Sequence, residues 1–174
     1  MISKKQNLKI ATILPYKENY SFEYASAASL WVAEFFEKSI FKKNNFIYGN
    51  TKSKNYLTKN YKNINLKNLD SKIKSSTKEY SLKLIKEIND KKYDLVEIHN
   101  RPLILFNLVS KIQCKFVFYF HNDPLSMDGS TSIDDRIYLI NNINKLIFNS
   151  NWSKHRFFLD LPKNKIDFNK IDVC

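Results

Sequence analysis

The chain has 174 residues, the length of one domain, which excludes a second large domain. Because 43% of its residues are hydrophobic and 14% are aromatic, it can bury a substantial core, and wholesale disorder is excluded. The formal net charge of +12 favours nucleic acid or anionic lipid as a partner.

Short apolar runs alternate with segments of helical periodicity, which is the pattern of a parallel sheet covered by helices. Pro15 and Gly49 end the first two apolar runs, and an edge strand is expected near Ile64 and Leu66 within a polar connection. The helices are predicted from apolar residues that recur every three or four positions. In chain order the predicted elements are strand 8–14, helix 22–40, strand 46–48, polar connection 50–71, helix 73–88, strand 94–98, helix 103–112, strand 115–120, helix 132–142, strand 145–148, helix 151–159 and strand 170–173.

This order predicts the α/β fold class, as a three-layer Rossmann-like domain with one parallel sheet over residues 1–174. No apolar run reaches the roughly 18 residues of a membrane span, and the run after residues 1–9 is too short for a signal-peptide core. We therefore expect a cytoplasmic protein. Cys114 and Cys174 lie far apart in the sequence, so neither a disulfide framework nor a cysteine-based metal site is expected.

Several chemistries have no motif in the sequence. There is no G-x-x-x-x-G-K-[ST] phosphate loop and no G-x-G-x-x-G, and Gly49 and Gly129 are the only glycines. We therefore expect no bound cofactor and no nucleotide binding by this chain alone. The three histidines lack metal-ligand spacing, and the pair Asp134–Asp135 is interpreted as first-turn carboxylates of a helix, so no metal is expected.

The positive charge is concentrated in one segment. Residues 42–92 carry 14 cations against four acids, whereas the segments before and after are each only +1. The chain is also rich in Lys, Asn and Ile, a bias that A/T-rich codons produce without selection for a ligand. We expect a solvated lysine-rich surface, with peripheral contact at the inner face of a membrane as the alternative. Nucleic-acid binding is not expected, because the chain has only three arginines.

Polar and ionisable residues follow four of the predicted strands. Open parallel sheets place their ligand crevice at the carboxyl ends of the strands, so these residues are expected to share one crevice. The alternative is that they are ordinary turn and cap residues, above all Asn149 or Ser150 as a helix N-cap. Two His-Asn pairs at equivalent corners favour a ligand site. The candidates are Tyr16, His99, Asn100, Arg101, His121, Asn122, Asp123, Asn149 and Ser150.

Five sequence pieces, in their order and spacing, carry a resemblance to a known family. They are the ILP corner after the first strand, the helix A-S-A-A-S-L-W-V, and the segments EIHNRP, FYFHNDP and IFNSNW. Together they resemble the N-terminal half of a family-4 glycosyltransferase of the GT-B fold, over residues 9–173. The resemblance implies two facing Rossmann-like domains, of which the N-terminal one mainly binds the acceptor and the C-terminal one the nucleotide-sugar donor.

The resemblance also implies residue roles. His121 matches a histidine that reaches the transferring sugar and is the expected catalytic residue. Asn149 and Ser150 match an N/S pair, and His99 with Arg101 matches a crevice-facing turn. The remaining expected substrate contacts are Asn100, Asn122, Asp123 and Tyr16.

Two departures from the family pattern are visible. Residues 23–27 stand where many members carry a Gly-Gly pair, and the E-x-x-x-x-x-x-x-E motif of the donor domain has no counterpart. We therefore expect a single N-terminal GT-B domain that lacks the C-terminal donor domain. Without that donor domain, we expect the chain to be inactive.

The resemblance implies transfer of a sugar, with retention, from a nucleotide-sugar donor to a saccharide or lipid-linked acceptor in surface-polysaccharide or lipopolysaccharide assembly. One rival interpretation is a non-catalytic module that binds a sugar or a partner in the same crevice. Another is a basic adaptor for a membrane surface or nucleic acid that uses residues 42–92.

Overall fold

The computed structural model describes residues 8–66, 75–162, 164 and 166–174. Its strands and helices follow one another in the alternating order that the sequence predicts. The elements are β1 (Ile10–Ile13), α1 (Ala27–Lys38), η1 (Lys42–Asn44), β2 (Asn45–Gly49), β3 (Tyr61–Asn63), α2 (Ser76–Lys91), β4 (Leu95–His99), α3 (Pro102–Leu108), β5 (Lys115–Phe120), η2 (Pro124–Ser126), α4 (Ile133–Asn141), β6 (Lys145–Phe148), α5 (Asn151–Phe158), η4 (Phe168–Lys170) and β7 (Ile171–Val173).

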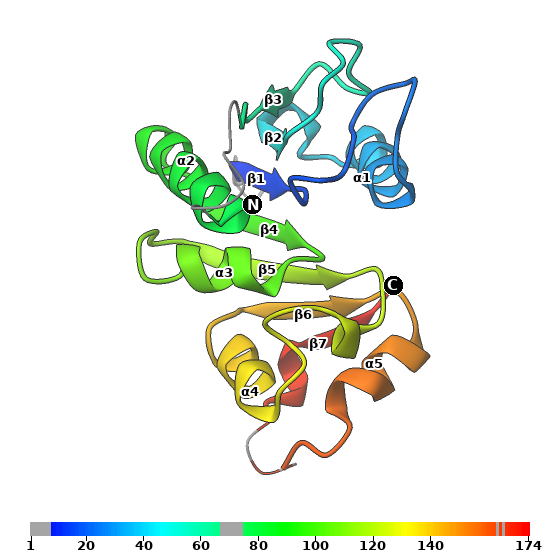
Figure 1. The fold of residues 1–174 in the computed structure, drawn as a ribbon, viewed down its shortest axis with the longest axis vertical. Helices are drawn as coiled ribbons and strands as arrows, with labels where there is room; N and C mark the ends of the chain where they lie inside the picture. The colour runs from blue at the N-terminus through cyan, green and yellow to red at the C-terminus, as the bar shows by residue number, and fades with distance from the viewer. Residues whose placement is uncertain (1–7, 67–74, 163, 165) are drawn as a thin grey trace, which may run out of the picture.

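The described strands form one seven-stranded sheet in the order β3-β2-β1-β4-β5-β6-β7, and every pair is parallel. In Figure 1 all the arrows therefore point to the same side, and the chain ends there. The strand order reverses between β1 and β4, where Ile13 pairs with Ile98. The predicted α/β class with a parallel, Rossmann-like sheet is confirmed.

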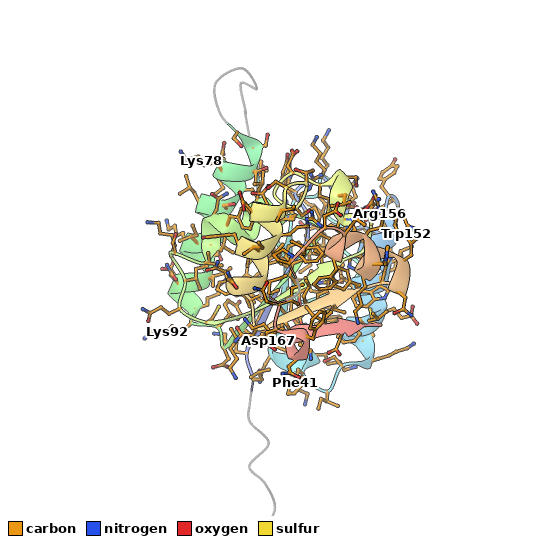
Figure 2. All side chains as sticks on the ribbon, turned by 90° about the horizontal axis from the view of Figure 1, so that it is seen from below. Phe41, Lys78, Lys92, Trp152, Arg156 and Asp167 are labelled. Carbon is orange, nitrogen blue, oxygen red and sulfur yellow. The ribbon has the colours of Figure 1, made fainter. Side chains whose placement is uncertain are left out.

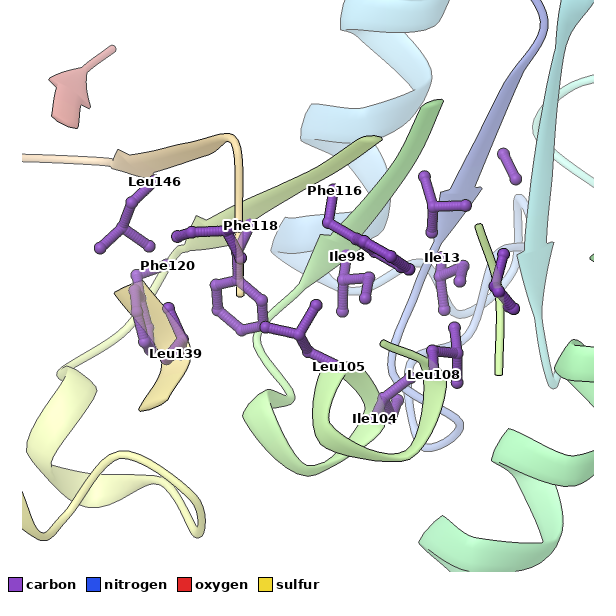
Figure 3. Packing of buried hydrophobic residues seen from close by; sticks show 14 of the residues in the cluster. Ile13, Ile98, Ile104, Leu105, Leu108, Phe116, Phe118, Phe120, Leu139 and Leu146 are labelled. Carbon is purple, nitrogen blue, oxygen red and sulfur yellow. The ribbon is translucent and has the colours of Figure 1, made fainter. Parts of the chain in front are cut away.

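Helices α2, α3, α4 and α5 cover one face of the sheet. Every second residue of each strand points to this face. These residues are apolar because they are buried between the sheet and the helices. Figure 3 shows Ile104, Leu105 and Leu108 of α3 packed against Ile98 and Phe118 of the central strands. This cluster is the main hydrophobic core.

Helix α1 covers the opposite face over β1 and β2. Val32 and Phe36 of the helix pack with Leu14, Ile47 and Tyr61 in a second, smaller cluster. The carboxyl-end loops that follow these strands are joined to each other, since Ser21 and Tyr56 form an isolated antiparallel bridge. The loop that leads from β1 into α1 is thereby fixed beside the end of the sheet.

The predicted start of the first helix at residue 22 was wrong. The helix begins at Ala27, because the Ser26 side chain accepts a hydrogen bond from the Ser29 backbone and caps it. Phe22 precedes the helix and is 65% exposed. Apolar residues at helical spacing therefore continued into a loop, which periodicity alone does not distinguish from a helix.

Other boundaries moved by smaller amounts. The edge strand β3 pairs with β2 through Tyr61 and Asn63, a few residues before the predicted Ile64 and Leu66. Helix α3 ends at Leu108, before the predicted end at residue 112. Ile73, which was predicted to begin the second helix, lies outside the described residues.

The described part of the basic segment 42–92 does not form one surface. It passes from η1 and the loops around β3 to α2, and these lie at different sides of the sheet in Figure 1. Figure 2 shows Lys78 and Lys92, near the two ends of α2, projecting on the side away from Trp152 and Arg156 of α5. On α2, Lys83 and Lys91 pair with glutamates one turn earlier, which neutralises part of that charge.

Among the residues that the structure describes, no helix is long and apolar enough to cross a bilayer. Within the same residues, no three His, Cys, Asp or Glu side chains come together as a metal-binding group. Cys114 is half-buried and Cys174 is exposed, and both are free thiols.

Candidate functional site

A crevice of about 440 Å³ opens at the carboxyl ends of the central strands. This is the edge where open parallel sheets bind their ligands, and the volume lies within the range of small-molecule sites. Its wall comes from the N-terminus of α1 and its floor from the corners after β4, β5 and β6. The lining residues are Glu18, Ser26, Ala27, Ala28, Trp31, Asn100, His121, Asn122, Asn149 and Cys174.

A second hollow of about 220 Å³ adjoins the crevice and shares Glu18, Asn100 and Asn122 with it. Arg101 and Asp128 add opposite charges to its wall. The two hollows together offer carboxylate, amide, imidazole and guanidinium groups within one polar site. Such a mixture suits a ligand with many hydroxyl or phosphate oxygens.

Two histidines from neighbouring strands contact each other at the floor of the crevice. Nδ1 of His99, the last residue of β4, lies 2.7 Å from Nε2 of His121, which follows β5. The rings of His99 and Tyr119 are stacked, with centroids 4.7 Å apart. Parallel pairing of β4 with β5 places His99 beside Tyr119 and so brings the two histidines together. The sequence separation of 22 residues gives no sign of this contact.

The two histidines differ in exposure. His99 is only 1% exposed and lies beneath the crevice, whereas His121 is half-buried and lines it. The predicted role of His99 as a substrate contact stays a prediction, and the structure places this side chain behind His121. The predicted catalytic role of His121 also stays a prediction, and its ring does border the crevice.

Burial sets the charge of this pair. It lowers the pKa of His121 from the usual 6.5 to about 4. Burial, followed by the neighbouring His121, holds the pKa of His99 well below its usual range. Both imidazoles are therefore neutral near pH 7, and one of them donates the hydrogen bond that joins them.

Trp31 of α1 forms the aromatic wall beside the histidines. Its ring lies edge-on to His121, with centroids 5.0 Å apart, and 5.5 Å from Tyr119. Together with Ala27 and Ala28 it makes the α1 side of the crevice apolar. Trp31 was not predicted as a site residue, although it lies in the helix segment A-S-A-A-S-L-W-V that carries part of the resemblance.

Asn100 and Arg101 take different positions in the turn after β4. Asn100 has φ 54°, a left-handed conformation that asparagine tolerates, and its Oδ1 accepts a hydrogen bond from the His121 backbone at 2.7 Å. It therefore joins two corners and lines both hollows. The Arg101 guanidinium lies 5.9 Å from the ring centre of Tyr16 and borders the second hollow. Tyr16 itself lines neither hollow, so it supports Arg101.

The sequence left open whether Asn149 and Ser150 contact a ligand or cap a helix, and the two residues take different roles. Asn149 lines the crevice and its Nδ2 donates to the His121 carbonyl at 2.7 Å. Ser150 is the N-cap of α5, since its side chain accepts from the Ser153 backbone at 3.1 Å. The cap interpretation is confirmed for Ser150, and Asn149 fixes the corner that carries His121.

Asn122 and Asp123 also take different positions relative to the two hollows. Asn122 is exposed and lines both hollows. Asp123 lines neither and accepts hydrogen bonds from Arg156 at 3.1 and 3.3 Å and from the Leu125 backbone. The hydrogen bond from Arg156 is the main cause that lowers the pKa of the Asp123 carboxyl. Asp123 therefore holds the corner to α5, and its predicted contact with substrate stays a prediction.

Glu18 was not predicted and lies in both hollows. It follows Pro15, Tyr16 and Lys17 in the loop after β1, and its backbone N–H donates to the Pro15 carbonyl at 3.0 Å. That turn brings its side chain to the crevice rim. The available signal was its place in the polar corner after the first strand, residues 15–18, from which only Tyr16 was predicted to contact substrate.

A larger hollow, of about 670 Å³, lies at the opposite end of the sheet between the ends of α2 and α3. It is lined by Lys92, Tyr93, Lys111 and their neighbours, at the amino ends of the strands. We assign the functional site to the smaller crevice, because ligands of open parallel sheets bind at the carboxyl ends and the converging polar groups lie there.

The fold is similar to that of several solved structures. HepE of Anabaena, solved in complex with UDP-glucose, matches 95% of this chain at 12% identity with a TM-score of 0.61. A glycosyltransferase from Rickettsia africae matches 95% at 17% identity with a TM-score of 0.59. UDP-N-acetylglucosamine 2-epimerase from Rickettsia bellii matches 95% at 11% identity with a TM-score of 0.58. No family model and no curated protein matches the chain.

This likeness confirms a GT-B-like fold for the chain. The chain spans 43%, 42% and 44% of the lengths of those three proteins, so it corresponds to less than half of each. Both transferases and an epimerase share the fold, and the fold by itself does not choose between their activities.

Proposed function

We propose that this chain is the N-terminal, acceptor-binding half of a GT-B glycosyltransferase of the family-4 type. The enzyme transfers a sugar from a nucleotide-sugar donor to a saccharide or lipid-linked acceptor. One observation carries the proposal: a crevice of sugar size at the carboxyl ends of the strands, with neutral His121 on its floor. The likeness in fold to solved glycosyltransferases supports it.

The composition of the crevice suits a sugar. Glu18, Asn100 and Asn122 offer acceptors and donors for hydroxyl groups, and Trp31 offers an apolar face for the C–H side of a ring. His121 is the residue that would touch the reacting sugar, and its low pKa keeps the imidazole uncharged, so that it binds hydroxyl groups. Asn149 and Asn100 hold its backbone in place.

The finer parts of the proposal follow the sequence resemblance. They are a retaining transfer, a role in surface-polysaccharide or lipopolysaccharide assembly, and a cytoplasmic location. Donor binding is proposed for a facing C-terminal domain, as the sequence resemblance implies. On this proposal the chain alone is inactive in transfer.

Two variants test the proposal. In the protein encoded by the complete gene, His121→Ala should reduce sugar transfer from UDP-glucose or related donors by at least about 100-fold, the usual size of a lost catalytic contact. His155→Ala removes an exposed histidine of α5 and is the matched control, with unchanged transfer expected. Equal activity of His121→Ala and wild type would exclude the proposed role.

A non-catalytic sugar- or partner-binding module is the second candidate. It is favoured by the lining of the crevice, because Glu18, Asn100 and Asn122 can bind hydroxyl groups without any chemical step. Saturation-transfer NMR with methyl glucosides separates the candidates when combined with the assay above. Sugar binding that His121→Ala abolishes, with no transfer by the complete gene product for any nucleotide sugar, would establish the binding module.

We also propose peripheral membrane contact, through the paired loops after β1 and β2. Phe22 and Tyr24 are 65% and 73% exposed there, and Glu23 ties them to the lysine-bearing loop by accepting hydrogen bonds from Ser53 and Asn55. Exposed aromatics beside lysines suit an anionic interface.

Sedimentation with phosphatidylglycerol vesicles tests this contact. Replacing Lys52 and Lys54 by Gln should reduce binding at low salt by up to about 30-fold, since each near-surface cation contributes up to about 1 kcal/mol. The control replaces Lys78 and Lys86 of α2 by Gln, on another side of the molecule. Equal losses of vesicle binding in the two variants, or no binding by the wild type, would contradict the membrane contact. The lysines would then be a solvated surface only.

A further inference from the structure

A row of buried polar side chains runs beneath the crevice on the α1 face of the sheet. Thr12, Asn45, Glu97 and His99 are each 9% exposed or less, although the neighbouring strand positions are apolar. Buried polar groups cost free energy unless they are hydrogen-bonded. The proposed sugar contacts do not use Glu97, Thr12 or Asn45, so their presence calls for another explanation.

One buried atom in this row has no partner. Nε2 of His99 has no hydrogen bond within the described part of the chain, while Nδ1 of the same ring is bonded to His121. His99 lines a small cavity of about 10 Å³, whose wall also includes Glu97, Thr12 and Trp31. That volume is close to the smallest that holds one water molecule.

The spacing of Glu97 and His99 fits a single bridging water. They are two residues apart on β4, so both point to the α1 face, about 6.6 Å apart along the strand. Their side chains line the same small cavity, and one water in it can hydrogen-bond to both. From α1 only apolar or aromatic side chains reach the cavity, and β5 contributes the Tyr119 ring stacked on His99. Glu97 is therefore the only carboxyl group of the described residues that lines it.

Glu97 keeps an acceptor oxygen whatever its charge. The Thr12 hydroxyl lies 2.7 Å from Oε2 of Glu97 and 3.0 Å from Oδ1 of Asn45, but it has only one proton to donate. If Thr12 donates to Asn45, Glu97 is protonated on Oε2. If it donates to Glu97, the Asn45 amide is turned so that its nitrogen donates to Thr12. Burial raises the pKa of Glu97, which favours the first arrangement, and Oε1 remains an acceptor in both.

We propose that Glu97, through one bridging water and His99, holds His121 in the tautomer that presents an unprotonated Nδ1 to the crevice. The negative end of the Glu97 carboxyl group attracts a proton to Nε2 of His99. Nδ1 of His99 then accepts from Nε2–H of His121, and Nδ1 of His121 is left as an acceptor. Glu97 and His99 are thus positioning residues.

This arrangement defines the ligand chemistry of the site. An uncharged acceptor on the crevice floor selects a group that donates a hydrogen bond, such as a sugar hydroxyl, and discriminates against a bare carboxylate or phosphate oxygen. The choice of a hydroxyl donor rests on the proposed sugar-binding function. The tautomer of His121 does not, and it is measurable without a ligand.

Long-range ¹H–¹⁵N NMR of the full chain tests the proposal, because it distinguishes protonated from unprotonated ring nitrogens. The chain has three histidines, of which exposed His155 serves as the internal reference. In the wild type at pH 7 we expect protonated Nε2 and unprotonated Nδ1 for both His99 and His121. A protonated Nδ1 on His121 would overturn the proposal.

Two variants of Glu97 separate its polar role from its volume. Glu97→Gln keeps an acceptor oxygen, and its amide nitrogen replaces the proton donor to Thr12, so we expect the wild-type tautomers. Glu97→Met keeps the length and removes both oxygens, so the His121 signals should shift toward the Nδ1-protonated form. Unchanged signals in a folded Glu97→Met protein would refute the role of Glu97. If Glu97→Met does not fold, a high-resolution crystal structure of the wild type decides, and the absence of a water between Glu97 and His99 would refute it equally.

Discussion

Successive residues of β4 point to opposite faces of the sheet, and the two faces bury different chemistry. Val96 and Ile98 point to the face covered by α2 to α5, where the buried cluster is aliphatic and aromatic. Glu97 and His99 point to the face covered by α1, where they join Thr12 and continue to the crevice. One face of this domain therefore carries the main hydrophobic core, and the other carries a smaller apolar cluster together with the polar residues beneath the site. A register slip of one residue would exchange them, so the sheet register must be strongly specified.

The largest expected effect lies on the apolar face. Phe118→Ala on β5 should lower the free energy of unfolding by about 3 to 5 kcal/mol, because a fully buried ring is replaced by a cavity. Its neighbour Val117 points to the α1 face and is only half-buried, so Val117→Ala should cost roughly 1 kcal/mol. Urea unfolding followed by circular dichroism gives both values. Similar costs for the two variants would contradict the contrast between the faces.

A buried cation on the apolar side gives the next effect. Arg136 is 4% exposed and donates to the carbonyls of Phe157 and Leu159 at 2.6 and 2.8 Å. Arg136→Met should destabilise the protein by about 3 kcal/mol, since buried carbonyls lose a charged donor. Arg156→Met, which removes the more exposed pair with Asp123, is the control and should cost at most about 1 kcal/mol. A smaller loss for Arg136→Met than for Arg156→Met would show that these carbonyls find other donors.

The histidines of the α1 face make stability depend on pH. The pKa of His121 is about 4 in the folded protein against 6.5 when unfolded, so between these values the unfolded chain binds more protons. The contribution of His121 to the free energy of unfolding is fully present above pH 6.5. It is lost as the pH falls, and the loss reaches roughly 3 kcal/mol at pH 4.

The measurement is urea unfolding between pH 4 and pH 7.5. His121→Asn should flatten the slope over this range, and His155→Asn should not. His99 has the same sign, because its pKa is also lowered, and adds a slope that both variants retain. Glu97 has the opposite sign, because burial raises its pKa, so its contribution is lost as the pH rises. A wild-type and a His121→Asn profile of the same slope would contradict the neutral, buried state of His121.

The smallest effect concerns the helix caps. Ser26 caps α1 and Ser132 caps α4, on opposite faces, with hydrogen bonds to backbone N–H groups at 3.2 and 3.1 Å. Ser26→Ala and Ser132→Ala should each cost about 1 kcal/mol. Only Ser26→Ala should also shift the NMR signals of the His121 ring, because Ser26 lines the crevice. Equal shifts from both variants would mean that the crevice is coupled to the apolar face.

Much of the fold was predictable, because it depends on local patterns. Buried parallel strands are continuous apolar runs such as residues 115–120, and their alternation with helical periodicity fixes the class. The corners after the strands were predictable for the same reason, since a parallel sheet places every carboxyl end at one edge. Boundaries such as the start of α1 were not, because the helix begins at its Ser26 cap although the apolar periodicity extends back to Phe22, which is left exposed.

The sequence by itself therefore determined the sheet, its covering helices and the edge at which the polar residues gather. Only the tertiary structure decided which of those residues reach the crevice. Asp123 and Ser150 are used by Arg156 and by the α5 backbone, His99 lies under His121, and Glu18 enters from the loop after β1. The physical reason is that hydrogen-bond partners and burial are set by contacts between residues far apart in the chain. Neither strand periodicity nor motif spacing contains those contacts.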